Sequence, residues 1–201
     1  MKYCDIINVE VKAMYYHASQ VKDIKELVPH ISNHKKPLIY FSEKRENVLV
    51  YLSNAVEKFC KENNFKWDEG WNKWASYGFD KDGIERIEEY YPNALEETYK
   101  GVSGYIYSVE IIENINKQED IPFAYTTSDS VKVDGCEYIK DAYEAILEEE
   151  KKGNIRIVRY VEFVKTKKEW LYKVIKREYN DPNITLDYKY FLENKFKNIL
   201  K

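Results

Sequence analysis

The sequence predicts a single α+β domain with mixed or antiparallel sheets flanked by helices, and three observations support this prediction. The 201 residues are enough to bury one core, and 44% of them are hydrophobic against 33% charged. Segments with strand-like and with helical spacing of apolar residues both occur along the whole chain. They do not alternate steadily, as they would in a doubly wound parallel sheet, so the α+β class is favoured.

The N-terminal part begins with two predicted strands. Residues 11–17 and 37–41 are short apolar runs rich in aromatic side chains. The segment between them contains Pro29 and predicts a short helix followed by a loop. After Ser42, a candidate N-cap, apolar residues recur at helical spacing, which predicts an amphipathic helix over residues 43–63.

The middle of the chain contains weaker signals. Residues 64–83 hold three of the four tryptophans and three glycines without a regular period. This pattern predicts an irregular segment that forms a lid or cleft wall outside the core. A polar helix is expected over residues 84–90, followed by a strand within 101–112 and extended segments at 121–127 and 130–139.

Capping residues predict the helices of the C-terminal part. Asp141, with Glu144 three residues later, begins a helix that should end before Gly153. A second capping pattern at 166–169 predicts a helix through Tyr179.

A predicted strand and a terminal helix complete the chain. Apolar and basic residues alternate over 155–163, which predicts a strand with one basic face, and Asp181–Pro182 should begin the terminal helix. We therefore distinguish an α+β part, residues 1–163, from basic C-terminal helices, residues 164–201, that pack on the same domain.

Charge is distributed unevenly along the chain. Residues 1–150 carry 18 basic and 29 acidic side chains, whereas residues 151–201 carry 14 and 6. A basic segment of this kind can bind nucleic acid or dock against the acidic part of the chain, and both alternatives stay open. In the first case Arg156, Arg159 and the lysines of 165–177, with aromatic side chains between them, would contact a single strand.

The sequence predicts a cytoplasmic protein without membrane association. The N-terminus lacks the basic-then-apolar layout of a secretory signal, and no stretch approaches the about 18 apolar residues that span a bilayer. Cys4, Cys60 and Cys136 are odd in number and widely spaced, which predicts reduced and mostly buried thiols.

The sequence contains two histidine contexts that could form binding sites. His30 and His34 have the spacing of metal ligands on one helix face, but the adjacent Pro29 argues against a helix, so no metal site is predicted. His17 ends a predicted apolar strand, and Ser19 follows it closely. A histidine in this place can hydrogen-bond the sugar hydroxyls of a ligand, and a satisfied core histidine is the alternative. The chain contains no P-loop, GxGxxG, HExxH, GxSxG or EF-hand pattern.

Several short runs together resemble the opening of the ADP-ribosyltransferase superfamily, which includes poly-ADP-ribose polymerase-like enzymes and RNA 2′-phosphotransferases. The runs are Tyr-His-Ala-Ser at 16–19, Leu-Val-Pro at 27–29, Leu-Ile-Tyr-Phe-Ser at 38–42 and Val-Tyr-Leu at 50–52. The resemblance implies an ADP-ribosyltransferase-like fold and NAD as substrate. By the same resemblance His17 would bond the adenosine ribose, Ser19 would support the nicotinamide side, and Tyr40 would stack near the nicotinamide ring. We expect the side chains of His17 and Tyr40 to line one cleft on neighbouring strands.

The catalytic carboxylate is the open point of this resemblance. In the polymerase-like branch a glutamate at the start of a late strand stabilises the positive charge that develops as the glycosidic bond breaks. Glu137 and Asp129 are the nearest acidic residues to the expected place, and each could equally be a turn acid. Two functions therefore stay open. One is transfer of ADP-ribose from NAD to a protein or nucleic acid, and the other is a non-catalytic interaction or nucleic-acid-binding protein on the same scaffold.

Overall fold

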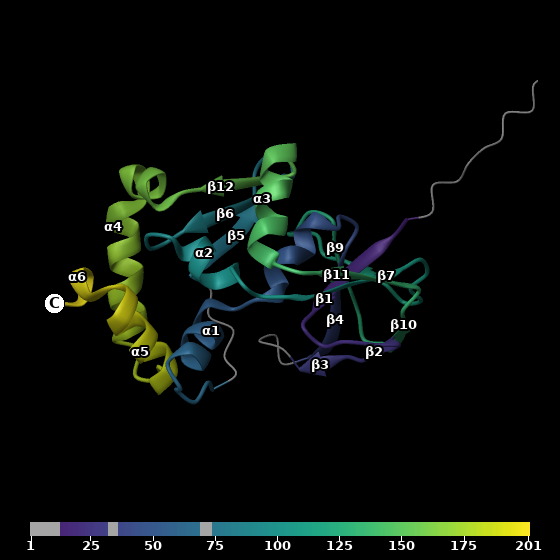
Figure 1. The fold of residues 1–201 in the computed structure, drawn as a ribbon, viewed down its shortest axis with the longest axis horizontal. Helices are drawn as coiled ribbons and strands as arrows, with labels where there is room; N and C mark the ends of the chain where they lie inside the picture. The colour runs from purple at the N-terminus through teal and green to yellow at the C-terminus, as the bar shows by residue number, and fades with distance from the viewer. Residues whose placement is uncertain (1–12, 32–35, 69–73) are drawn as a thin grey trace, which may run out of the picture.

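The computed structural model describes residues 13–31, 36–68 and 74–201. These residues form three β-sheets, six α-helices and one 3₁₀-helix. The largest sheet lies at one end of the molecule and the C-terminal helices lie at the other, with a smaller sheet between them (Figure 1). The α+β class, the antiparallel sheets and the C-terminal helices are confirmed.

The large sheet has seven strands, with the order β11-β7-β1-β4-β9-β8 and with β3 also paired to β4. Among the described residues, all of its strand pairings are antiparallel. Its strands are β1 (Tyr15–Ser19), β3 (His30–Ile31), β4 (Pro37–Ser42), β7 (Gly104–Val109), β8 (Asn116–Lys117), β9 (Ala124–Thr127) and β11 (Gly135–Ile139).

A two-stranded sheet covers part of one face of the large sheet. It pairs β2 (Glu26–Leu27) with β10 (Val131–Lys132). Leu27 and Val131 from this pair pack with Ile39 and Phe41 of β4 in a small core cluster. The short helix predicted between the first two long strands is therefore wrong, because the described part of this segment contains β2 and β3.

The three-stranded sheet contains β5 (Ala75–Phe79), β6 (Glu85–Glu89) and β12 (Ile155–Val158). The central strand β6 pairs antiparallel with β5 and parallel with β12. The helix predicted over residues 84–90 is therefore wrong. Glu85, Ile87 and Glu89 alternate with less buried residues, so β6 has the two-residue period of a strand although two of its buried side chains are acidic.

The helices follow the local capping signals where the bonds are local. They are η1 (Glu46–Leu52), α1 (Ala55–Glu62), α2 (Ala94–Tyr99), α3 (Ala142–Lys152), α4 (Tyr160–Tyr179), α5 (Leu186–Lys195) and α6 (Lys197–Leu200). For α3 both predicted ends are confirmed: the Asp141 side chain accepts the N–H groups of Tyr143 and Glu144, and Gly153 is left-handed. The single helix predicted over 43–63 is instead η1 and α1, because Ser53 is extended and Asn54 caps α1 anew.

The transition from β12 to α4 departs from the prediction. The strand ends at Val158, and α4 already begins at Tyr160. The Glu89 carboxylate of β6 accepts the Tyr160 N–H at 3.1 Å, a contact between residues distant in sequence. The predicted boundary at residue 163 therefore lies inside α4, and the strand predicted through 163 is wrong in its second half.

The terminal helix also begins later than predicted. It starts at Leu186, and Asp181 instead holds a turn in which its carboxylate accepts the Asn183 N–H.

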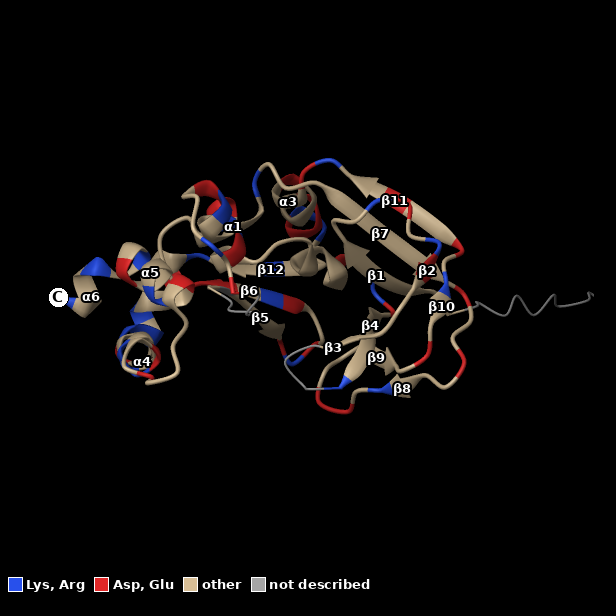
Figure 2. Cartoon of the chain, turned by 90° about the horizontal axis from the view of Figure 1, so that it is seen from below, with Lys and Arg blue, Asp and Glu red and all other residues tan. Residues whose placement is uncertain are grey.

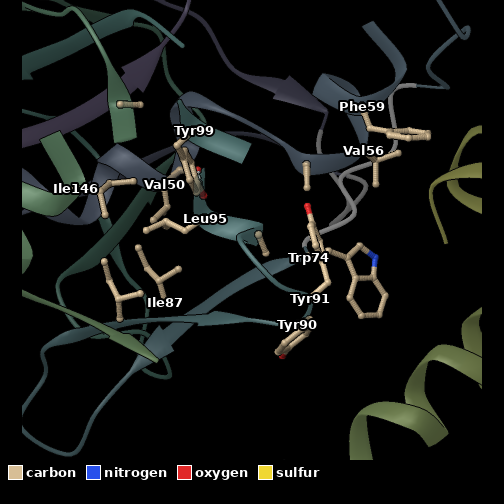
Figure 3. Close-up of a cluster of buried hydrophobic side chains, with 14 of the residues drawn as sticks. Val50, Val56, Phe59, Trp74, Ile87, Tyr90, Tyr91, Leu95, Tyr99 and Ile146 are labelled. Atoms are coloured by element: carbon tan, nitrogen blue, oxygen red, sulfur yellow. Dashed lines mark hydrogen bonds between the residues drawn. The ribbon is translucent and has the colours of Figure 1, made fainter. Parts of the chain in front are cut away.

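One large core cluster joins the three-stranded sheet to the helices on both sides of it. Trp74 and Tyr91 lie close together in this cluster, while Tyr99, Val50 and Ile87 fill the part nearer the large sheet (Figure 3). The Trp74 indole N–H donates to the Tyr188 hydroxyl at 2.9 Å, which ties the start of β5 to α5.

The core extends across both predicted parts of the chain. Side chains from β12, α4, α5 and α6 belong to the same cluster as those of α1 and α2. Since Trp74 is only 3% exposed, the prediction that residues 64–83 lie outside the core is wrong for Trp74. Trp71 lies outside the described residues. Within the described ranges, no helix has the length and apolar character needed to cross a bilayer.

Candidate functional site

The candidate site is centred on β1, which lies between β4 and β7 in the large sheet. Its pairing with β7 runs along the whole strand, whereas its pairing with β4 consists of Tyr16 opposite Ser42. Next to this pair, the His17 ring forms a hydrogen bond with the backbone of β4: Nδ1 lies 2.9 Å from the Tyr40 carbonyl oxygen. We call this place, where a side chain bridges the two strands, the β1–β4 parting.

The hydrogen bond to Tyr40 determines which nitrogen of His17 carries the proton. A carbonyl oxygen only accepts, so Nδ1 must donate. Burial lowers the pKa of His17, and the bond to the Tyr40 carbonyl opposes this shift only in part. The ring is therefore neutral at pH 7, and Nε2 has a lone pair that can accept a hydrogen bond from a ligand hydroxyl.

The structure places His17 and Tyr40 on neighbouring strands, as predicted, but on opposite faces of the sheet. Ile39 and Phe41 of β4 belong to the small core cluster, so Tyr40 between them faces the other side. The His17 ring lies on the Phe41 side, with the two ring centres 6.0 Å apart. The prediction that both side chains line one cleft is therefore wrong. The physical reason is the register of β1 against β4, which the two strand sequences do not reveal.

Ser19 lies on the same face as His17, two residues further along β1. Its hydroxyl oxygen accepts the Val21 N–H at 3.1 Å. Across the sheet Ser19 is opposite Tyr105 of β7, and Tyr105 is opposite Tyr138 of β11. Residues directly opposite each other in antiparallel strands share a face. We call Ser19, Tyr105 and Tyr138 the tyrosine row.

Sequence reasoning missed the tyrosine row. Tyr105 was recognised within a predicted strand, but nothing indicated that this strand lies beside β1. The signal that could have been used is the alternation of Tyr105 and Tyr107, which places both rings on one face of β7. The structure confirms this, because their ring centres are 6.2 Å apart.

Tyr40 faces a cluster of tyrosines and one buried carboxyl group. It interacts electrostatically with Tyr51, whose ring meets Tyr77 edge to face at 5.5 Å. Glu85 at the start of β6 interacts with both Tyr51 and Tyr77 and is 1% exposed. Burial raises its pKa well above the usual value, with a smaller contribution from Glu46, so burial favours the protonated form of this carboxyl group.

The two candidate catalytic acids lie apart from His17. Glu137 of β11 is opposite Ile106, which is opposite Ala18, so Glu137 shares a face with Ala18 and not with His17. Its carboxylate accepts two hydrogen bonds from Arg45, at 2.7 and 2.6 Å. This bond to Glu137 is the main cause that raises the pKa of Arg45.

Asp129 is held in the turn after β9. Its carboxylate accepts the Asn114 side-chain amide at 2.8 Å, and its own N–H donates to the Thr127 hydroxyl at 3.1 Å. This is the arrangement of a turn acid, which the sequence had left as an alternative.

The basic residues of the C-terminal part are partly engaged with acids. Arg156 contacts Asp80 and Glu162, and Arg159 contacts Glu150. Lys and Arg residues nonetheless recur along α4 and α6 (Figure 2).

The predicted thiols and the histidine pair have different outcomes. Cys60 is a buried free thiol as predicted, but the free thiol of Cys136 is exposed, and Cys4 lies outside the described residues. His30 is exposed on β3, and His34 again lies outside the described residues. Among the residues that are described, no group of three or more His, Cys, Asp or Glu side chains could hold a metal ion.

Comparison of the chain with protein-family models, with curated proteins and with solved structures found no match. No family is assigned on these grounds.

Proposed function

We propose that the protein binds NAD at the β1–β4 parting, as an ADP-ribosyltransferase-like protein. The observation that supports this most directly is the state of His17. Its Nδ1 is occupied by the Tyr40 carbonyl, so a neutral ring offers Nε2 to a ribose hydroxyl. The Ser19 hydroxyl lies on the same face, whereas the Tyr40 side chain lies on the opposite face and only the Tyr40 carbonyl oxygen contacts His17.

The proposed activity is cleavage of NAD at the nicotinamide glycosidic bond, with transfer of ADP-ribose to a protein or nucleic acid. Such a reaction needs a carboxylate that stabilises the positive charge of the transition state. Glu137 could take this part only after leaving Arg45, which holds both of its oxygen atoms, and only for a ligand that also reaches the opposite face of the sheet from His17.

This ion pair favours a second candidate function. A non-catalytic interaction protein would bind the nucleotide without cleaving it, and would have no need of a free carboxylate beside the ribose.

Binding is tested by calorimetric titration of NAD into the parent protein and into a His17→Asn variant. The asparagine amide can still donate a hydrogen bond to the Tyr40 carbonyl, but the variant lacks the acceptor that Nε2 provides. Leaving a ligand hydroxyl unpaired costs about 1–3 kcal/mol, so affinity should fall roughly five- to a hundredfold. His30→Asn, in an exposed position on β3, is the matched control and should bind as the parent does.

No NAD binding at millimolar concentration, or equal losses in both variants, would refute the proposal. The melting temperature of each variant excludes loss of fold as the cause.

Turnover is tested by measuring nicotinamide release. If Glu137 or Asp129 is the charge-stabilising carboxylate, Glu137→Gln or Asp129→Asn should abolish release and spare NAD binding, because this interaction grows only toward the transition state. Binding without any release in the parent protein would establish the second candidate.

A further inference from the structure

Three strands bring an aromatic surface next to His17. In the tyrosine row the rings of Tyr105 and Tyr138 lie 5.3 Å apart, and the ring of Tyr107, 6.2 Å from that of Tyr105, is fully buried. Tyr107 is directly opposite His17. The accessible aromatic surface is therefore formed by Tyr138 of the edge strand β11 and Tyr105 of β7, which is opposite Ser19 on the face that also carries His17.

This surface is open to solvent at its outer end. Tyr138 is 57% exposed, and Tyr105 is partly buried. Val21 is 62% exposed and lies next to the buried Tyr107, whose hydroxyl donates to the Val21 carbonyl at 2.7 Å. Exposed apolar and aromatic side chains that lie together are typical of binding surfaces.

The polar groups on the same face indicate the kind of ligand. His17 and Ser19 are two residues apart on β1, about 7 Å by strand geometry, which is a distance that one nucleoside can span. One end of this span has the rings of the tyrosine row, and the other has a histidine lone pair suited to a hydroxyl group. A ligand in which a planar ring is joined to a sugar can contact both the tyrosine rings and the histidine lone pair.

We propose that the tyrosine row is a stacking platform for the purine base of a nucleotide whose ribose reaches Nε2 of His17. The proposal rests on the proposed function, because it takes the ribose contact of His17 from there. It adds a subsite, formed by Tyr105 and Tyr138, that binds the adenine base. Every base has a π-face, and aromatic side chains bind it by stacking.

The test uses AMP as the probe, with ribose 5-phosphate as a probe that lacks the base. Tyr138→Leu keeps the apolar bulk and removes the aromatic ring. It should weaken AMP binding in calorimetry by roughly five- to a hundredfold. It should leave the weaker binding of ribose 5-phosphate unchanged, and Tyr138→Phe should retain the affinity for AMP.

A distant exposed tyrosine provides the matched control. Tyr190 on α5 is 38% exposed and its ring lies 5.1 Å from that of Phe65, so Tyr190→Leu makes the same change in a similar aromatic pair. This variant should bind AMP as the parent protein does.

The outcomes separate the platform from the proposed function. Unchanged AMP affinity in Tyr138→Leu, or an equal loss in Tyr190→Leu, refutes the platform even if NAD binding depends on His17. A loss of AMP binding that is specific to Tyr138→Leu supports the platform. It does so even if His17→Asn leaves NAD binding unchanged, and in that case the proposed ribose contact is the part that fails.

Discussion

Replacement of Glu85 by glutamine should remove a pH dependence of stability that comes from a single buried acid. Burial raises the pKa of Glu85 well above the ordinary value of about 4.3, so the folded protein holds a proton that the unfolded chain releases. The stability contributed by this proton is fully present below about pH 4. It is lost as the pH rises through the raised pKa of the folded state.

The size of the effect follows from proton linkage. Between the two pKa values each pH unit costs about 1.4 kcal/mol of unfolding free energy. Between pH 5 and pH 7 the parent protein should therefore lose up to about 3 kcal/mol relative to Glu85→Gln, if the folded pKa lies above 7. A lower folded pKa would shorten the range over which the difference grows, but not its slope.

The measurement is urea denaturation at a series of pH values, followed by tryptophan fluorescence. Trp74 is buried in the core and should report unfolding. Glu148→Gln, in an exposed position on α3, is the matched control and should follow the parent curve. If the difference between Glu85→Gln and the parent protein is constant across pH, the inference that Glu85 is protonated in the folded protein is refuted.

Two further predictions concern local structure. Asp141→Ala removes both side-chain hydrogen bonds at the start of α3 and should cost about 1 kcal/mol of unfolding free energy in urea denaturation, so an unchanged midpoint would contradict the capping role. Gly104→Val should lower the melting temperature and weaken any binding at β1, because a Cβ atom at Gly104 would lie 2.6 Å from the Leu52 side chain and 3.0 Å from the Ser19 carbonyl oxygen. Equal melting temperatures would contradict this prediction, because they would show that β7 can move away from β1 and Leu52 without loss of stability.

Local signals in the sequence predicted the elements whose defining bonds are local. The ends of α3 were predicted correctly because Asp141 bonds residues two and three positions away, and Gly153 needs only its own backbone freedom. The start of α4 was predicted seven residues late, with Thr166 as the N-cap in place of Arg159, because the Glu89 carboxylate that holds the Tyr160 N–H comes from another strand. The same carboxylate accepts the Leu95 N–H at 3.1 Å, so one buried acid positions the beginnings of two helices.

The same distinction between local and tertiary information applies to the candidate site. Sequence reasoning identified β1 and β4 as neighbouring strands and identified His17 as a residue that could bind a sugar, but it placed Tyr40 on the wrong face relative to His17. It also missed Tyr105 and Tyr138 as neighbours of Ser19. A shift of one residue between two strands reverses the face of every side chain, and neither strand sequence contains that information.

The sequence by itself determined the α+β class, the positions of β1, β4, β7, β9 and β11 in the large sheet and of α3, and the residues proposed as ligands of a sugar. The tertiary structure alone decided which of these residues share a face, which carboxyl groups are paired and which one is buried. Glu137 and Glu85 illustrate the difference, since both are glutamates within short strands. The first is held by Arg45 at the surface, while the second lies among tyrosines in the core, where burial raises its pKa. The reason is that periodicity and capping depend on neighbours in the chain, whereas register, ion pairing and desolvation depend on elements that meet only when the chain has folded.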